Sequence, residues 1–276
     1  MGWHANLKLD YTLESERSVA RFAHDGPLRV LKSLYPEGDS VCHNVLVHPP
    51  GGLVGGDTLD IQVTVGEGAH GLITTPGAAR FYRSDGAPAL QRTTLKLATG
   101  ARLEWLPLEA LLYSGCIAEN KLVFDLEPGA QMLGWDVISL GLPDANLAFD
   151  KGTFSQHIEM PGHWLERGTL AASDSQLLQS PLGLAGQTCV ASLFFAAGNN
   201  LERSLRDTLL DAAREVTGAH ALKASAGATS PGPRLVVLRV LAPRVEPAMD
   251  LLRKVWLSWR GLAWGKVADM PRIWAM

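Results

Sequence analysis

Three side chains that could bind a transition metal lie within seven residues of one another: Cys42, His43 and His48. Thiolate and imidazole groups are suitable donors for nickel. On the extended segment indicated by the valines around them, Cys42 and His43 would point to opposite faces, and Cys42 and His48 would lie about 20 Å apart on one face. These residues are therefore weak candidates for a transient or intermolecular metal site, and one ion would need a further chain segment.

Acidic residues near aromatic or basic side chains form a second candidate group: Glu104, Glu109, Asp136 and Glu166. Pairs of carboxylates hydrolyse glycosidic bonds, and the distance between them sets the mechanism. A carbohydrate-active enzyme with a wound β fold is therefore the alternative hypothesis, and it predicts an acidic groove with exposed aromatic side chains. An ion pair with Arg167 is the simpler interpretation of Glu166.

Two glycine pairs precede an acid in the segment Pro49–Asp57. Glycine-rich loops can bind phosphates through their backbone N–H groups. Here no Gly-Lys-Ser or Gly-Lys-Thr follows, and the next segment alternates as a strand, whereas the phosphate-binding motifs open a helix. The segment predicts a tight turn with left-handed glycines. No Gly-x-Ser-x-Gly elbow is present either, so the residues favour a binding role without catalysis.

Residues 1–190 contain short alternating apolar segments separated by Gly and Pro, as expected of β-structure. A Gly-Ala turn recurs about every 30 residues, at Gly68, Gly100 and Gly129. Each turn joins two strands, and a repeated unit of this length is typical of coils that bury their apolar faces on one another. We predict a mainly β, helically wound and layered architecture. A sandwich of hairpins is equally compatible with the periodicity.

Residues 191–276 change to an α+β pattern, which predicts a small two-helix part within a single domain spanning 1–276. One helix is predicted to begin with Asn200 as N-cap and to end at Gly218 as the C′ glycine. A loop over 225–233 is predicted next, then a strand over 235–241. The second helix is predicted to open at Pro247 and to end near Trp259.

The composition, with 46% hydrophobic and 19% charged residues, is typical of an ordinary globular protein. The net charge of -3 and the pI of about 6.2 do not indicate binding to nucleic acid or to an anionic membrane. No apolar run reaches the roughly 18 residues of a membrane span. Cys42, Cys116 and Cys189 form no C-x-x-C pair, which indicates a reducing, cytoplasmic compartment without structural zinc.

Several longer strings occur in a fixed order along the chain and carry a family resemblance. They are Gly26–Val30, His48–Asp57, Thr74–Ala78, Phe81–Ser84, Leu103–Pro107, Gly134–Trp135, Glu166–Arg167, Ser180–Leu184 and Pro271–Trp274. These strings resemble, in the same order, those of the UreD (also called UreH) family of urease accessory proteins. They cover most of the first 185 residues and the C-terminus.

The resemblance implies a wound β fold with a small helical part and no catalysis by this chain. It implies binding to the urease apoprotein and, through UreF, to the GTPase UreG, for nickel insertion into urease. No cofactor would be tightly bound, and a nickel ion would pass in transit through a polar interior tunnel. Four residues then become candidates for the tunnel or an interface, and each could equally be a buried structural residue: Asp57, Ser84, Asp136 and Glu166.

The chain departs from the family pattern at a few positions: Leu108, Cys116, Leu142, Leu147 and Met276. The departures concern polar or small residues elsewhere in the family. They imply altered local polar contacts near residues 140–147, and they leave the resemblance intact.

Overall fold

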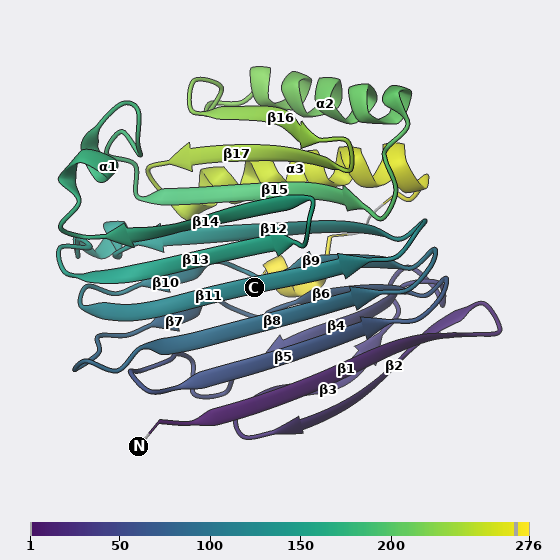
Figure 1. The fold of residues 1–276 in the computed structure, drawn as a ribbon, viewed down its shortest axis with the longest axis horizontal. Coiled ribbons are helices and arrows are strands. Elements are labelled where there is room, and N and C mark those ends of the chain that lie inside the picture. Colours follow the sequence, from purple (N-terminus) through teal and green to yellow (C-terminus); the bar gives the residue numbers. More distant parts are fainter. Residues whose placement is uncertain (1, 268–269, 276) are drawn as a thin grey trace.

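The computed structural model describes residues 2–267 and 270–275; Met276, one of the departures noted above, lies outside them. Two facing β-sheets form the body of the molecule, and two helices cover part of one sheet (Figure 1). None of the described helices has both the length and the apolar character needed to span a membrane.

Sheet A has seven strands in the described part of the chain, and they lie at the front in Figure 1. In spatial order they are β14 (Trp164–Ala171), β13 (Gly152–Met160), β11 (Cys116–Leu126), β8 (Ala89–Leu97), β5 (Thr58–Val65), β1 (His4–Glu14) and β2 (Arg17–Asp25). Pairing from β1 through β13 is parallel, and the outermost pairs β1–β2 and β13–β14 are antiparallel.

Sheet B has ten strands among the described residues and lies behind sheet A. Its main path is β16 (Ala226–Gly232), β17 (Leu235–Ala242), β15 (Cys189–Ala197), β12 (Gln131–Leu140), β9 (Arg102–Leu106), β6 (His70–Thr74), β4 (Cys42–Val47) and β3 (Arg29–Leu34). The short strand β10 (Ala110–Leu112) pairs with the end of β12 on one side and with β7 (Ala79–Phe81) on the other.

The chain winds between the sheets, so the predicted coiled architecture is confirmed. It passes from sheet A to sheet B at three turns that contain Gly68, Gly100 and Gly129, with φ of +66°, +67° and +78°. Left-handed backbone favours glycine because a Cβ atom would crowd the neighbouring carbonyl group. The predicted repeat therefore marks successive coils, whose strands stack in parallel register.

The two predicted helices exist, but their bounds differ from the prediction. Helix α2 (Arg203–Gly218) begins after Glu202, because the backbone N–H of Leu201 still donates to the carbonyl of Pro233 at the end of the sheet. Gly218 is the last helical residue of α2 and does not follow it as a C′ glycine. Helix α3 (Val245–Trp264) starts earlier and ends later than predicted, and Gly265 caps it with φ of +62°.

The predicted loop over 225–233 is wrong for most of its length, since Ala226–Gly232 forms the edge strand β16. Its Gly and Pro residues are tolerated because an edge strand pairs on one side only, and a register shift separates Thr229 from Gly232. The remaining short elements are helix α1 (Ser175–Gln179) and the 3₁₀ helices η1 (Pro143–Ala145) and η2 (Arg272–Ala275).

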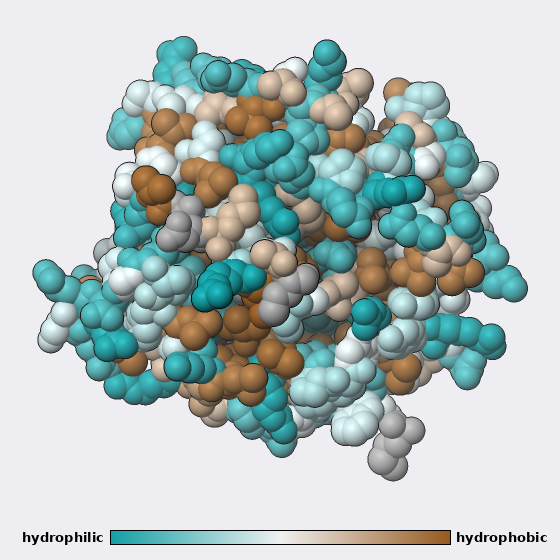
Figure 2. All heavy atoms as spheres, turned by 180° about the vertical axis from the view of Figure 1, so that it is seen from behind, coloured by the Kyte–Doolittle hydropathy of each residue, from teal (hydrophilic) through white to brown (hydrophobic). Residues whose placement is uncertain are grey.

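Sheet B separates two hydrophobic cores, one between the sheets and one beneath α2 and α3. The helices pack on β12, β15, β16 and β17, and apolar residues on the outer side of the edge strand β3 are exposed. On β3, Leu31 is 77% exposed and Leu34 is 43% exposed. Figure 2 views the molecule from this side and shows apolar side chains gathered on its lower half.

The C-terminal segment returns to the middle of sheet B. Trp274 in η2 donates its indole N–H to Thr74 Oγ1 on β6 at 2.8 Å. Its ring packs against Trp135 and Trp256 at centroid distances of 5.2 and 5.5 Å. The last described residues thus fasten α3 to a strand from early in the chain.

Helix α3 is also joined to sheet B by buried charges, which we call the α3 ion cluster: Glu37, His43, His70, Glu104 and Arg260. The Arg260 guanidinium lies 2.6 Å from Glu37 Oε2 and 3.0 Å from Glu104 Oε1. Burial opposes ionisation of Glu37, but hydrogen bonds from His43 and Arg260 lower its pKa to about 2. Burial lowers the pKa of His70, so Arg260 supplies the positive charge at neutral pH.

We predict that Arg260→Met destabilises the protein by about 3–5 kcal/mol, because Glu37 and Glu104 would keep buried charges without a cation. Urea unfolding at neutral pH measures this loss. Lys254→Met on the same helix, where Lys254 pairs with Asp250 in solvent, serves as the control and should change stability by less than about 0.5 kcal/mol. Equal small losses in both variants would contradict a structural role for the cluster.

Candidate functional site

A row of amide side chains crosses the inner face of sheet A. Asn120 on β11 is the register partner of Gln91 on β8 and of Gln156 on β13. Inward positions of stacked parallel strands share a face, so the three amides lie side by side within the apolar interior. The amide of Gln91 donates to Asn120 Oδ1 at 3.3 Å.

A second polar row faces the first from sheet B. Asp136 on β12 pairs in register with Ser192 on β15, which pairs with Arg239 on β17. The Asp136 carboxylate accepts hydrogen bonds from Asn120 at 3.1 Å and from Gln156. We call the two rows together the polar band: Gln91, Asn120 and Gln156 with Asp136, Ser192 and Arg239.

Asp136 is the buried acid of the polar band. Its pKa is raised to about 6, chiefly by burial and also by the nearby charge of Glu166, while the hydrogen bonds from Gln156 and Asn120 oppose the rise. A carboxylate with such a pKa exchanges its proton readily near neutral pH. It can therefore take up a cation in place of the proton.

Glu166 closes the polar band at the edge of the sandwich. Its carboxylate accepts a hydrogen bond from Arg239 Nη2 at 2.6 Å, so the ion pair predicted with Arg167 is wrong. Neighbouring residues of a strand point to opposite faces, and the inward position of Glu166 on β14 directs it to sheet B. Just before the starts of β14 and β17, Arg234 Nη1 lies 2.9 Å from His163 Nε2, a second contact between the sheets.

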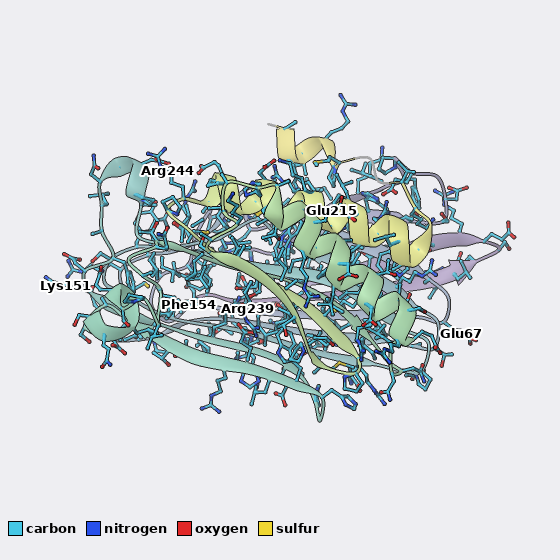
Figure 3. All side chains as sticks on the ribbon, turned by 90° about the horizontal axis from the view of Figure 1, so that it is seen from above. Glu67, Lys151, Phe154, Glu215, Arg239 and Arg244 are labelled. Carbon is cyan, nitrogen blue, oxygen red and sulfur yellow. The ribbon has the colours of Figure 1, made fainter. Side chains whose placement is uncertain are left out.

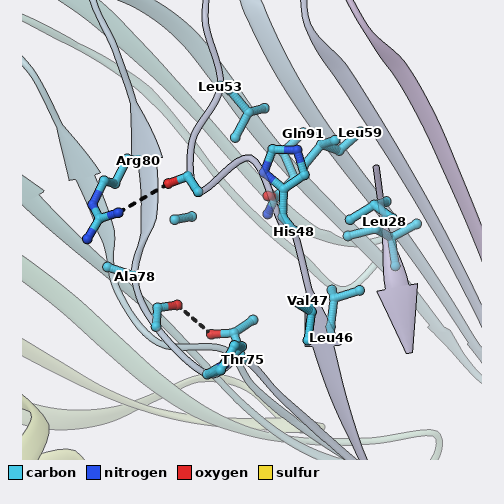
Figure 4. Close-up of a pocket in the computed structure, with 15 residues that line it drawn as sticks. Leu28, Leu46, Val47, His48, Leu53, Leu59, Thr75, Ala78, Arg80 and Gln91 are labelled. Carbon is cyan, nitrogen blue, oxygen red and sulfur yellow. Dashed lines mark hydrogen bonds between the residues drawn. The ribbon is translucent and has the colours of Figure 1, made fainter. Parts of the chain in front are cut away.

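The other end of the polar band opens into a cavity of about 240 Å³. His48, Arg80 and Gln91 give it polar groups, and Figure 4 shows them on its walls. A smaller cavity of about 50 Å³ is lined by Asn120 and Asp136. Both cavities share Leu46, Thr75, Ala79 and Gln91 as lining residues. Polar groups therefore continue from the cavity wall to Asp136.

Asp57 and Ser84 belong to the turns beside the cavity. The buried Asp57 carboxylate accepts the backbone N–H groups of Trp3 at 2.8 Å and Val54 at 2.9 Å. Ser84 Oγ donates to the carbonyl of Ala87. Among the described residues neither side chain is hydrogen-bonded to the polar band, so the structure brings Asp136 and Glu166 together and places Asp57 and Ser84 elsewhere.

The glycine-rich segment is the turn that the sequence predicts. Gly51 and Gly56 have φ of +76° and +94°. A Cβ atom on Gly55 would overlap Ser84 Oγ, so this loop and the loop after β7 approach through the missing side chain. No helix follows the turn, and β5 begins at Thr58.

Cys42, His43 and His48 lie in three different environments. Cys42 faces the core, with Sγ 3.6 Å from Asn44 Oδ1, whereas His43 faces α3 and lies 2.7 Å from Glu37 Oε1. His48 lines the larger cavity. Within residues 2–267 and 270–275, no group of three or more His, Cys, Asp or Glu side chains is arranged to hold a metal ion.

Glu104 and Asp136, two of the four carboxylates considered for glycoside hydrolysis, lie on opposite faces of sheet B. Glu104 on β9 belongs to the α3 ion cluster, beneath the helices. Asp136 on the adjacent strand β12 faces the interior between the sheets. Two acids on opposite faces cannot flank one glycosidic bond, so this pair does not support the carbohydrate-active alternative.

The sequence analysis did not name Asn120 and Gln156 of the polar band as candidates, although the alternation of their strands contains a signal for them. Asn120 interrupts the inward apolar series of Ala118, Leu122 and Phe124, and Gln156 stands between the inward residues Phe154 and Ile158. A polar residue at an inward position of an alternating strand marks a buried polar group, which requires a partner.

Comparison with known proteins places the chain among urease accessory proteins. The family model described as UreD urease accessory protein matches residues 4–275. The chain is 69% identical over 276 residues to urease accessory protein UreD of Albidiferax ferrireducens. It is 65% identical over 276 residues to that of Polaromonas naphthalenivorans and 65% identical over 275 residues to that of Variovorax paradoxus. These alignments cover 100% of this chain and of each relative.

We predict that Asp136→Asn stabilises the protein at pH 7.5 by roughly 3 kcal/mol. The pKa of about 6 lies above the ordinary value of 3.8, so the folded state binds the proton more tightly and the stability of the native protein falls as pH rises between these values. The advantage of the variant should vanish below about pH 4. Urea unfolding from pH 4 to 7.5 measures it, and a difference independent of pH would show that Asp136 has no raised pKa.

Proposed function

Because the chain belongs to the UreD family of urease accessory proteins, we propose that it acts in urease maturation as a non-catalytic scaffold that guides nickel to the urease apoprotein. The observation that carries this proposal is the polar band, a continuous set of hydrogen-bonding groups across an interior that is largely apolar. Such groups are costly to bury, so their alignment calls for a use beyond packing.

The oxygen atoms of the polar band and of Glu166 beside it are suitable ligands for a metal ion in transit. Asp136 and Glu166 offer carboxylate oxygens, and Gln91, Asn120 and Gln156 offer amide oxygens. Oxygen ligands hold a first-row transition metal less tightly than thiolates or imidazoles do. A scaffold must release its cargo, so nickel would pass along these groups without being kept as a bound cofactor.

We propose that the chain binds the urease apoprotein and UreF, and through UreF the GTPase UreG. The outer side of β3, with the exposed residues Leu31 and Leu34, supports a role in association, since exposed apolar groups favour protein contacts. We treat residues 1–276 as a single UreD-like domain, because β15, β16 and β17 extend the sheet begun by the earlier strands. The cytoplasm is the compartment expected for its free, buried cysteines.

We predict that Asp136→Ala lowers the nickel content of co-expressed urease by about tenfold, which corresponds to roughly 1.4 kcal/mol of lost ion stabilisation. Urease subunits, UreF and UreG are co-expressed with the variant, and nickel and urea hydrolysis are measured on purified urease. Asp125→Ala on the exposed face of β11 is the matched control and should leave loading unchanged.

Omission of the chain provides the reference and is expected to give urease without nickel. Fully active urease in that arm would overturn the maturation role. Normal loading by a folded Asp136→Ala variant would instead remove the polar band from the route while leaving the scaffold role in place.

A further inference from the structure

Both rows of the polar band end in a glycine at the same edge of the sandwich. Gly168 on β14 is the register partner of Gln156, and Gly227 on β16 is the register partner of Arg239. A Cβ atom added at either position would meet no atom within 4 Å. At the level of the polar band, the edge between β14 and β16 is therefore open to solvent.

One ion pair spans this open edge. Arg239 and Glu166 have side chains that are 46% and 30% exposed, so water reaches both charges. Figure 3 shows Arg239 between the layers of strands, on the side toward β16 and β17. Exposed ion pairs are weak and exchange readily, unlike the fully buried charges of the α3 ion cluster.

The surroundings of Arg239 give its side chain room to move. Its neighbours in register are Ser192 on β15 and Gly227 on β16, both small. The guanidinium can therefore leave Glu166 without displacing packed side chains. Its partner carboxylate would then face the open edge on one side and the Asp136 region on the other.

Charge balance makes Arg239 the competitor of a metal cation. With both acids ionised, Glu166, Asp136 and Arg239 together carry one net negative charge. A divalent cation that replaces the guanidinium would neutralise the two carboxylates completely. The same cation could not approach Glu166 while Arg239 occupies it, because two positive groups would then share one carboxylate.

We propose that the edge framed by Gly168 and Gly227 is the port through which a divalent cation reaches or leaves the polar band, and that Arg239 is its gate. The cation exchanges with the guanidinium at Glu166, and Arg239 returns when the cation has moved on. This inference rests on the proposed nickel route and names the residues that control access to it.

The port is tested by substitutions that place a bulky side chain in the open edge between β14 and β16. Gly227→Leu, or Gly168→Leu if the first variant fails to fold, places a side chain in open space and should lower the nickel content of co-expressed urease as strongly as Asp136→Ala. Gly218→Leu at the end of α2, also without a neighbour within 4 Å, is the control. Gel filtration verifies that each variant keeps urease and UreF bound.

The gate is tested on the purified chain by titration with Ni²⁺ in a calorimeter. Arg239→Gln should bind Ni²⁺ about three- to fivefold more tightly, because the competing charge is gone. Arg234→Gln, which removes the neighbouring contact to His163, should leave the affinity unchanged. An equal affinity in Arg239→Gln and the unmodified chain would overturn the gate.

The remaining outcomes separate this inference from the proposed function. Normal loading by the filled-port variants together with poor loading by Asp136→Ala would overturn the port and keep the nickel route. Normal loading by all of them would overturn both.

Discussion

Parallel register between successive coils sets the chemistry of the interior. Because β8, β11 and β13 stack without a shift, residues at equivalent inward positions become neighbours although they lie about 30 residues apart in the chain. One polar residue in each coil is therefore sufficient to build a row. On sheet B the row forms from antiparallel neighbours, since Asp136, Ser192 and Arg239 are register partners on β12, β15 and β17. A register slip of one residue would send every member to the outer face.

Sheet B carries buried polar groups on both faces, and they differ in how they are satisfied. Beneath α3, Arg260 contacts both Glu37 and Glu104, so the charges are closed off from solvent and fixed. Between the sheets, Asp136 receives hydrogen bonds from neutral amides, and Arg239 in the same row is bound to Glu166 instead. The first arrangement holds a helix in place, whereas the second leaves a buried acid without a fixed counter-ion.

Local signals in the sequence predict the coils well. The turn at Gly68 and its two repeats need left-handed backbone, and the alternation on each side follows from one buried face. The residues alone did not reveal the features that depend on distant contacts. Leu201 stays extended because it bonds to Pro233, and Glu166 pairs with a residue 73 positions away. Family resemblance supplied Asp136 and Glu166, and register on the folded sheets supplied their partners.

The hydrogen bond from Trp274 to Thr74 also constrains the order in which the chain can fold. The two residues are 200 positions apart, so the early coils gain this support only after the residues between them have been synthesised. Contacts of such long range slow folding and leave partly folded states exposed during translation. The early coils would therefore lack this support while the residues between Thr74 and Trp274 are being made.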